Sequence, residues 1–258
     1  MNHFVTFRNA VSARNERASP KRVARIIAML TGGVSEEMLG AMHEDGLLVA
    51  SGLITVERNV RDFENAVQLG DGFEGLMMLP HASEAEVTKR ILKPASPATL
   101  GLAAFPHLAR DIDALQAYLG NAMRGQEKGA NVLFYGPPGT GKTELAKAIA
   151  AGLGMELFEI PFADLEGDPI RGEKRLRAYN LCQKLLAQKQ NALLMFDEIE
   201  DVFESRGRFW ALFGGDADAG KGGKAWINRT LERNATPAIW ITNDPEIDPA
   251  YLRRFDYS

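Results

Sequence analysis

A run of eight residues near the middle of the chain has the types and spacing needed to hold a polyphosphate. The pattern G-x-x-x-x-G-K-[ST] is met at every fixed position by Gly136-Pro137-Pro138-Gly139-Thr140-Gly141-Lys142-Thr143. Glycines let the backbone turn tightly and aim its N–H groups inward, and a helix that follows adds partial positive charge. We therefore expect these eight residues to bind phosphate, with Lys142 on the β- and γ-phosphates and the Thr143 hydroxyl on Mg²⁺.

Polar side chains also follow two apolar runs later in the chain. Asp197 and Glu198 come directly after residues 193–196 (LLMF), and Asn243 lies near the end of residues 237–244 (PAIWITND). Parallel sheets bind their ligands at the carboxyl ends of their strands. We predict that Asp197 holds Mg²⁺, that Glu198 orients or deprotonates an attacking water, and that Asn243 contacts the γ-phosphate or that water.

Two adjacent arginines, Arg253 and Arg254, follow close behind Asn243. A guanidinium group is a planar cation that can neutralise the charge that develops on a transferred phosphoryl group. A surface salt bridge explains each arginine equally well. Their spacing alone therefore leaves both interpretations open.

These side chains need a sheet flanked by helices to bring them together. The apolar run 131–135 predicts a buried strand before the glycine loop, and residues 142–152 predict a helix after it. Residues 155–162 predict another strand and residues 173–190 an amphipathic helix, while a helix over 107–123 precedes the first strand. This alternation favours an α/β fold, in which helices cover both faces of a parallel sheet.

The N-terminal third has a different pattern. The expected elements are, in order, helices over 21–30 and 35–43 and a hairpin of 46–49 with 53–56. They predict a small, mostly helical, winged-helix-like domain over 1–92. A proline-rich linker over 93–106 is expected to join it to the α/β domain, 107–258.

Composition and charge exclude several classes of protein. The chain has 258 residues, of which 45% are hydrophobic and 25% charged, with a formal net charge of −4. This argues against a protein whose whole surface binds nucleic acid. No apolar run approaches about 18 residues, and no signal-peptide pattern is present, so we expect a cytoplasmic protein without a membrane partner. The single cysteine, Cys182, excludes an internal disulfide.

The first 30 residues are locally basic. Six cations face one acid, Glu16; they are Arg8, Arg14, Arg17, Lys21, Arg22 and Arg25. A nucleic-acid contact is one interpretation, but no aromatic residues interleave, so a solvated helix face is favoured.

The motifs GPPGTGKT, LLMFDEIED, WITND and IDPAYLRRFD, in this order and spacing, resemble the Walker A, Walker B, sensor 1 and second-region-of-homology segments of an AAA+ ATPase. The resemblance covers residues 105–258 and implies a P-loop NTPase core with a three-layer parallel sheet. It also implies an ATP-hydrolysing, Mg²⁺-dependent ring, usually a hexamer, with active sites between subunits. In that ring Asn243 would be sensor 1, and Arg253 or Arg254 would act on the neighbour's ATP. Residues 20–80 resemble the winged-helix region of some bacterial AAA proteins.

Three departures from the family pattern affect the predicted function. No aromatic residue precedes Gly172-Glu173, where the family's pore loop carries one. The usual Arg-Pro-Gly-Arg-Phe-Asp is shortened to RRFD, which leaves open which arginine is the finger. The chain stops at Ser258, before the family's fifth core strand and helical lid, so we expect a fragment whose strand 131–135 lies at a sheet edge.

Two classes of function therefore remain. One is a ring ATPase that remodels a protein or nucleoprotein partner. The other is a nucleotide-dependent assembly switch, or a module that recruits DNA or another partner with little turnover. An insert, 204–224, is either a loop that contacts the substrate or a neighbour, or a local apolar cluster.

Overall fold

The computed structural model describes two compact units, Met1–Pro80 and His81–Ser258. The described residues are 19–43, 46–50, 53–56, 66–69, 88–89, 91–163, 167, 169–170, 172–200, 230–244, 252–253 and 255–257. Within these ranges no helix has the length and apolar character needed to cross a membrane. The bounds expected from sequence, 1–92 and 107–258, stay a prediction.

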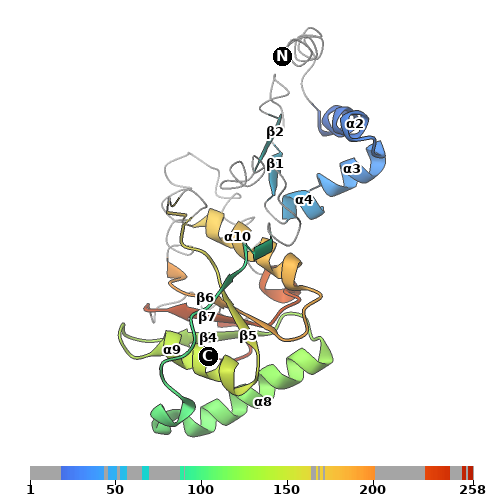
Figure 1. Ribbon diagram of the computed structural model, residues 1–258. Coiled ribbons are helices and arrows are strands. Elements are labelled where there is room, and N and C mark those ends of the chain that lie inside the picture. The colour runs from blue at the N-terminus through green and yellow to red at the C-terminus, as the bar shows by residue number, and fades with distance from the viewer. Residues whose placement is uncertain are drawn as a thin grey trace. The chain divides into compact units, whose positions relative to one another are not determined.

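The second unit is built on a five-stranded sheet with the strand order β3-β5-β6-β7-β4. Strands β5, β6, β7 and β4 run parallel, and β3 pairs antiparallel with β5 (Figure 1). In chain order the strands are β3 (Lys93–Pro94), β4 (Asn131–Tyr135), β5 (Glu156–Glu159), β6 (Ala192–Phe196) and β7 (Ala238–Thr242). The predicted α/β fold with a mainly parallel sheet is confirmed.

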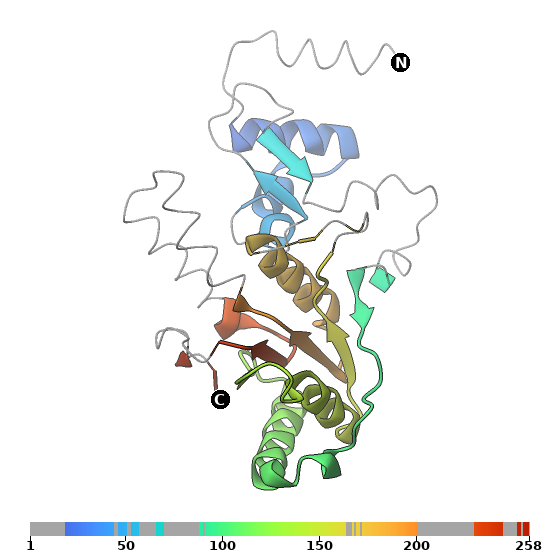
Figure 2. The ribbon, with the colours of Figure 1, turned by 90° about the vertical axis from the view of Figure 1, so that its left-hand side faces the viewer.

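Helices cover both faces of this sheet and make three layers (Figure 2). They are α8 (Ala109–Gly125), α9 (Lys142–Gly152) and α10 (Glu173–Leu186), with two short 3-10 helices, η1 (Leu102–Ala104) and η2 (Pro106–Leu108), before α8. Successive side chains of a strand point to opposite faces. Along β6, Leu194 and Phe196 therefore pack on the side of α10, whereas Leu193 and Met195 pack on the side of α8 and α9.

Residues 91–105, here named the strap, pack along this unit. The strap contains β3, and beyond it the Ala95 N–H donates to the Leu157 carbonyl at 2.8 Å. Phe105 is only 5% exposed and lies in the core shared by α8 and α9. The linker predicted over 93–106 stays a prediction, but these residues pair with β5 and pack on the second unit. Proline lacks an N–H to donate to a sheet, so it is tolerated in an edge strand as well as in a linker.

The strap is also tied to α9. Thr99 donates from its N–H and its hydroxyl to the Glu144 carboxylate, each at 2.8 Å. Lys147 Nζ donates to Ser96 Oγ at 2.9 Å and to Glu144 at 3.3 Å. The hydrogen bonds from Thr99 lower the pKa of Glu144 to about 2. Glu144 lies in the first turn of α9, so the strap is held to the helix that begins at the glycine loop.

The outer edge of β4 is partly paired. β4 is the last strand of the sheet, as expected, but the Asp256 N–H donates to the Asn131 carbonyl and the Leu133 N–H to the Tyr257 carbonyl, each at 2.9 Å. The Asp256 carboxylate accepts from the Tyr118 hydroxyl at 2.7 Å and from the Asn131 N–H at 3.1 Å. Residues 256–257 therefore cover part of an edge that the sequence predicted to be bare.

The first unit is helical with one pair of strands. Its elements are α2 (Pro20–Thr31), α3 (Ser35–Ala41), α4 (Leu47–Ala50), β1 (Ile54–Val56) and β2 (Val67–Leu69). Both predicted helices are present, but the predicted hairpin is wrong because residues 47–50 are helical. β1 pairs antiparallel with β2 instead. The winged-helix resemblance stays a prediction.

Two predictions fall outside the described residues. They concern the insert 204–224 and most of the basic N-terminal segment.

Candidate active site

The glycine loop connects β4 to α9 and requires glycine at its turns. Gly136, Gly139 and Gly141 have φ angles of 141°, 78° and 87°. Residues with a Cβ rarely adopt such angles. At Gly141 a Cβ would also stand 3.3 Å from Cε1 of the Phe105 ring. Glycine at the three positions therefore permits the turn, and at Gly141 it also permits the close approach of the strap.

Lys142 lies over the loop and reaches the end of β7. Its Nζ donates to the carbonyls of Gly136 and Pro137 at 2.9 and 2.8 Å. It also donates to Asn243 Oδ1 at 3.0 Å. The structure thus brings together two predicted site residues that are 101 positions apart.

Thr143 meets the end of β6. Its hydroxyl donates to Asp197 Oδ2 at 2.6 Å. Hydroxyl and carboxylate oxygens are the ligand types that Mg²⁺ prefers, and adjacent ligands of an octahedral Mg²⁺ stand about 2.9 Å apart. The two oxygens are close enough to ligate one ion. The residues predicted to bind the metal therefore fit it.

Glu198 directly follows and has an unusual backbone. Its φ is 53°, which is uncommon for a residue other than glycine, and its side chain is exposed. Its N–H donates to Asp197 Oδ1 at 2.9 Å. Both carboxylates thus lie at the carboxyl end of β6, as predicted.

Three residues that sequence reasoning missed support this edge of the sheet. The Asn243 N–H donates to a carboxylate oxygen of Glu200. The Ile199 N–H donates to the Ile241 carbonyl at 3.1 Å, which joins the segment after β6 to β7. The third is Arg175 of α10, whose guanidinium donates to main-chain carbonyls behind the two carboxylates. Arg175 falls on the buried stripe of its helix, a signal that the sequence does contain.

Only one of the two candidate finger arginines is among the described residues. Arg253 is exposed, and Arg254 lies outside the described residues. Phe255, two residues beyond Arg253, is buried in the core, and its ring centroid is 6.2 Å from that of Trp240. Arg253 is therefore presented at the surface from an anchored segment.

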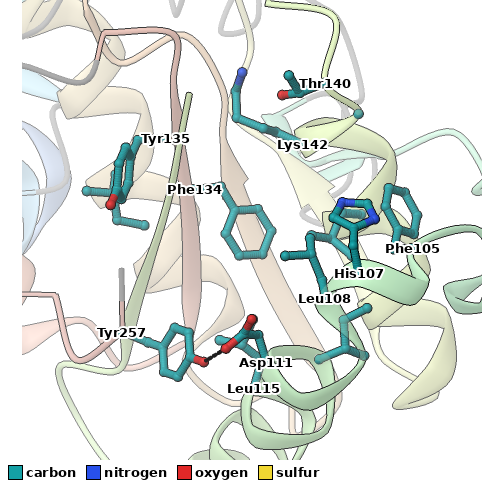
Figure 3. Close-up of a pocket in the computed structure, with 14 residues that line it drawn as sticks. Phe105, His107, Leu108, Asp111, Leu115, Phe134, Tyr135, Thr140, Lys142 and Tyr257 are labelled. Atoms are coloured by element: carbon teal, nitrogen blue, oxygen red, sulfur yellow. Dashed lines mark hydrogen bonds between the residues drawn. The ribbon is translucent and has the colours of Figure 1, made fainter. Parts of the chain in front are cut away.

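A cavity of about 360 Å³ opens beside the loop. In Figure 3 the rings of Phe105 and His107 lie on one side and that of Tyr257 on the other, with Phe134 between them and Lys142 at the rim. The Tyr257 hydroxyl donates to Asp111 Oδ1 at 2.8 Å, and this bond raises the pKa of Tyr257. The sequence did not reveal the cavity, because its walls come from four separate segments.

The sequence model of one protein family, described as "ATPase family associated with various cellular activities (AAA)", matches residues 132–258. The chain is 32% identical over 208 residues to an ATP-dependent zinc metalloprotease FtsH from Rhodococcus erythropolis, a match that covers 74% of this chain and 23% of the relative. It is 40% identical over 143 residues to the peroxisomal ATPase PEX6 from Saccharomyces cerevisiae, covering 51% and 13%. The chain spans less than a quarter of the length of these relatives.

One solved structure, titled "Structure of C. elegans PCH-2", resembles this fold at 18% sequence identity with a TM-score of 0.39. The match covers 69% of this chain and 46% of that one. No functional conclusion follows from it.

Proposed function

Residues 132–258 belong to the AAA ATPase family, and on this premise we propose that the chain binds ATP with Mg²⁺ and hydrolyses it. The observation that carries the proposal is the convergence of four side chains at one edge of the sheet. Lys142 lies 3.0 Å from Asn243, and Thr143 lies 2.6 Å from Asp197. The glycine loop thus faces the polar groups at the ends of both central strands, the arrangement that phosphoryl transfer uses.

Each side chain has a separate task in this proposal. Lys142 exchanges its neutral carbonyl partners for phosphate oxygens, which are stronger acceptors. Thr143 and Asp197 hold Mg²⁺, which when bound offsets negative charge on the β- and γ-oxygens. The exposed Glu198 carboxylate orients the attacking water and accepts its proton. Asn243 positions this water or the γ-phosphate.

The cavity beside the loop is the proposed binding site of the nucleotide base. It is lined mainly by aromatic and aliphatic side chains and adjoins Lys142, so a base in it could be continuous with phosphates on the loop (Figure 3). Pockets for small molecules are typically apolar with a few polar groups that fix orientation. Asp111 and His107 are such groups here.

The proposal extends to a ring of identical subunits that remodels a protein or nucleoprotein partner. Its support is the exposed Arg253, held by the buried Phe255 at a place from which it can reach a neighbouring molecule. An arginine that acts on the ATP of the next subunit makes hydrolysis depend on assembly.

A nucleotide-dependent assembly switch is the second candidate. It is favoured by Ile170, which is buried two residues before Gly172 and whose N–H donates to the Phe162 carbonyl at 2.9 Å. A buried isoleucine cannot serve as an exposed aromatic that grips a polypeptide.

Steady-state ATP hydrolysis over a range of protein concentrations tests the proposal. We expect the rate per subunit to rise with concentration and to vanish in Lys142→Ala, Arg253→Ala or Arg254→Ala. Full hydrolysis by Lys142→Ala would contradict it. Glu198→Gln should still bind ATP; if that variant assembles and acts on a partner as well as the native chain does, the switch is the better description.

A further inference from the structure

Arg175 and four of its contacts form a clamp behind the two carboxylates of the candidate site. The contacts are the rings of Phe162 and Phe196 and the main-chain carbonyls of Asp197 and Glu198. We propose that Arg175 is a positioning residue that fixes the turn after β6, so that Asp197 meets the metal and Glu198 meets the water. The inference rests on the proposed function and names a residue that the nucleotide motifs do not contain.

The two hydrogen bonds of the clamp lie on either side of one residue. The guanidinium donates to the Asp197 carbonyl at 2.6 Å and to the Glu198 carbonyl at 2.8 Å. These carbonyls belong to the two peptide planes that flank the Cα of Glu198. Fixing both planes fixes the direction in which the Cα–Cβ bond of Glu198 leaves the backbone. A planar fork of charged donors can bind two acceptors at once, which the single ammonium of lysine does less well.

The backbone of Glu198 needs such support. Its φ of 53° lies in a region that residues other than glycine sparsely populate, and such a conformation persists only where surrounding contacts hold it. The Asp197 carboxylate meanwhile accepts from Thr143 and from the Glu198 N–H. The same short segment therefore sets the positions of both carboxylates.

Arg175, the cation of the clamp, is buried, and removing a charged side chain from water costs free energy. Arg175 is 2% exposed, and its guanidinium carbon stands 4.6 Å from the centroid of each ring, Phe162 and Phe196. Cation–π contacts of this kind stabilise a guanidinium that has left water. Arg175 shares its helix stripe with Tyr179, Cys182 and Leu186, all buried. An apolar side chain would fill this place at lower cost, so the arginine indicates a requirement for its two donors.

The test compares Arg175→Lys with Lys174→Met, an exposed neighbour on the same helix, in the full chain. Three quantities are measured: affinity for ATP without metal, affinity of the chain–ATP complex for Mn²⁺, and kcat. We expect Arg175→Lys to weaken Mn²⁺ affinity and to lower kcat by about 10–100-fold, since supporting partners of a metal site have effects of this size. Affinity for metal-free ATP should stay unchanged, and Lys174→Met should behave as the native chain.

Two results would overturn the clamp. One is a folded Arg175→Lys with native Mn²⁺ affinity and native kcat. The other is a loss of metal-free ATP affinity in step with a lower Tm, which indicates packing alone. If the native chain binds ATP and Mn²⁺ without turnover, the proposed hydrolysis fails, but the Mn²⁺ measurement still decides the clamp. If Arg175→Lys does not fold, Phe162→Leu, which removes the partly exposed ring of the clamp, is measured in its place with the same expectations.

Discussion

Gly141 is the residue at which the glycine loop and the strap constrain each other most closely. Alanine there would have to keep φ at 87° and place its Cβ 3.3 Å from the Phe105 ring. The left-handed conformation costs alanine about 1–2 kcal/mol relative to glycine. We expect Gly141→Ala to lower the free energy of unfolding by at least this amount and to weaken ATP binding.

The matched control is Gly101→Ala on the strap. Gly101 has an ordinary φ of −81°, and nothing lies within 4 Å of an added Cβ. Chemical denaturation and nucleotide titration of both variants check the prediction. Equal behaviour of the two variants would contradict the role given to the Gly141 turn.

Glu144 makes the stability of the chain depend on pH. Its pKa in the folded chain is about 2, below the usual 4.5, because Thr99 donates two hydrogen bonds to the charged form. The unfolded chain therefore binds this proton more readily. The stabilisation is fully present above about pH 4.5 and is lost as the pH falls toward 2.

We expect Glu144→Gln to lower Tm at pH 6 and the difference from the native chain to shrink as the pH approaches 2. Glu127→Gln, at an exposed position of the same unit, serves as the control. Thermal unfolding followed by circular dichroism between pH 2 and 6 measures both. A difference in Tm that is constant over this range would rule out the carboxylate as its source.

The sequence predicted which candidate site residues lie close together better than it predicted the residues that support them. Lys142, Thr143 and Asp197 belong to patterns in which the chemistry dictates both residue type and spacing. Arg175 has no such pattern, because an arginine on an amphipathic helix usually faces solvent. Only its place on the apolar stripe of α10 distinguishes it, and the partner carbonyls belong to the backbone of a distant segment.

Among the elements, the strap packs in a way that the sequence did not reveal. Phe105 lies in the core of α8 and α9, so Phe105→Ala should cost about 3–5 kcal/mol of unfolding free energy, as for other buried aromatic residues. Leu100→Ala, on the same strap but 45% exposed, should change it by less than about 0.5 kcal/mol. Denaturant titrations of both variants measure the difference. A similarly small loss of unfolding free energy in both variants would favour the interpretation of these residues as a linker.

The remaining elements show where patterns suffice. The strands 131–135 and 192–196 were predictable, because each apolar run is followed directly by a polar motif, the glycine loop after the first and Asp197-Glu198 after the second. Residues 47–50 (LLVA) were not, since a short apolar run fits a strand or a helix equally well. Pro94 and Pro97 suggested a linker, but a segment with proline can also pair with a sheet edge, as β3 does.

At the scale of the whole molecule, the proposed sharing of active sites between subunits predicts complementation between inactive variants. Lys142→Ala lacks a working loop, and a double variant, Arg253→Ala with Arg254→Ala, lacks the finger. In a ring with head-to-tail contacts, some interfaces of a mixture pair an intact loop with an intact arginine. We therefore expect ATP hydrolysis to appear on mixing.

The control is the same mixture with a variant that carries all three substitutions in place of the double variant. That mixture should stay inactive. If the first mixture is as inactive as its parts, the arginines do not act across an interface, and sites within one chain must be considered instead.

The strap also has a mechanical consequence. From Leu92 onward, the strap first pairs with β5 and then bonds to α9 through Thr99. Only after these contacts does it reach the glycine loop, at Phe105. Tension on the preceding residues would have to break the β3 pairing and then the Thr99 hydrogen bonds before it could distort the glycine loop. A moderate pull would therefore leave ATP affinity unchanged, whereas a pull that detaches the strap would lower it abruptly. Nucleotide affinity would then stay constant up to a threshold force and fall sharply above it.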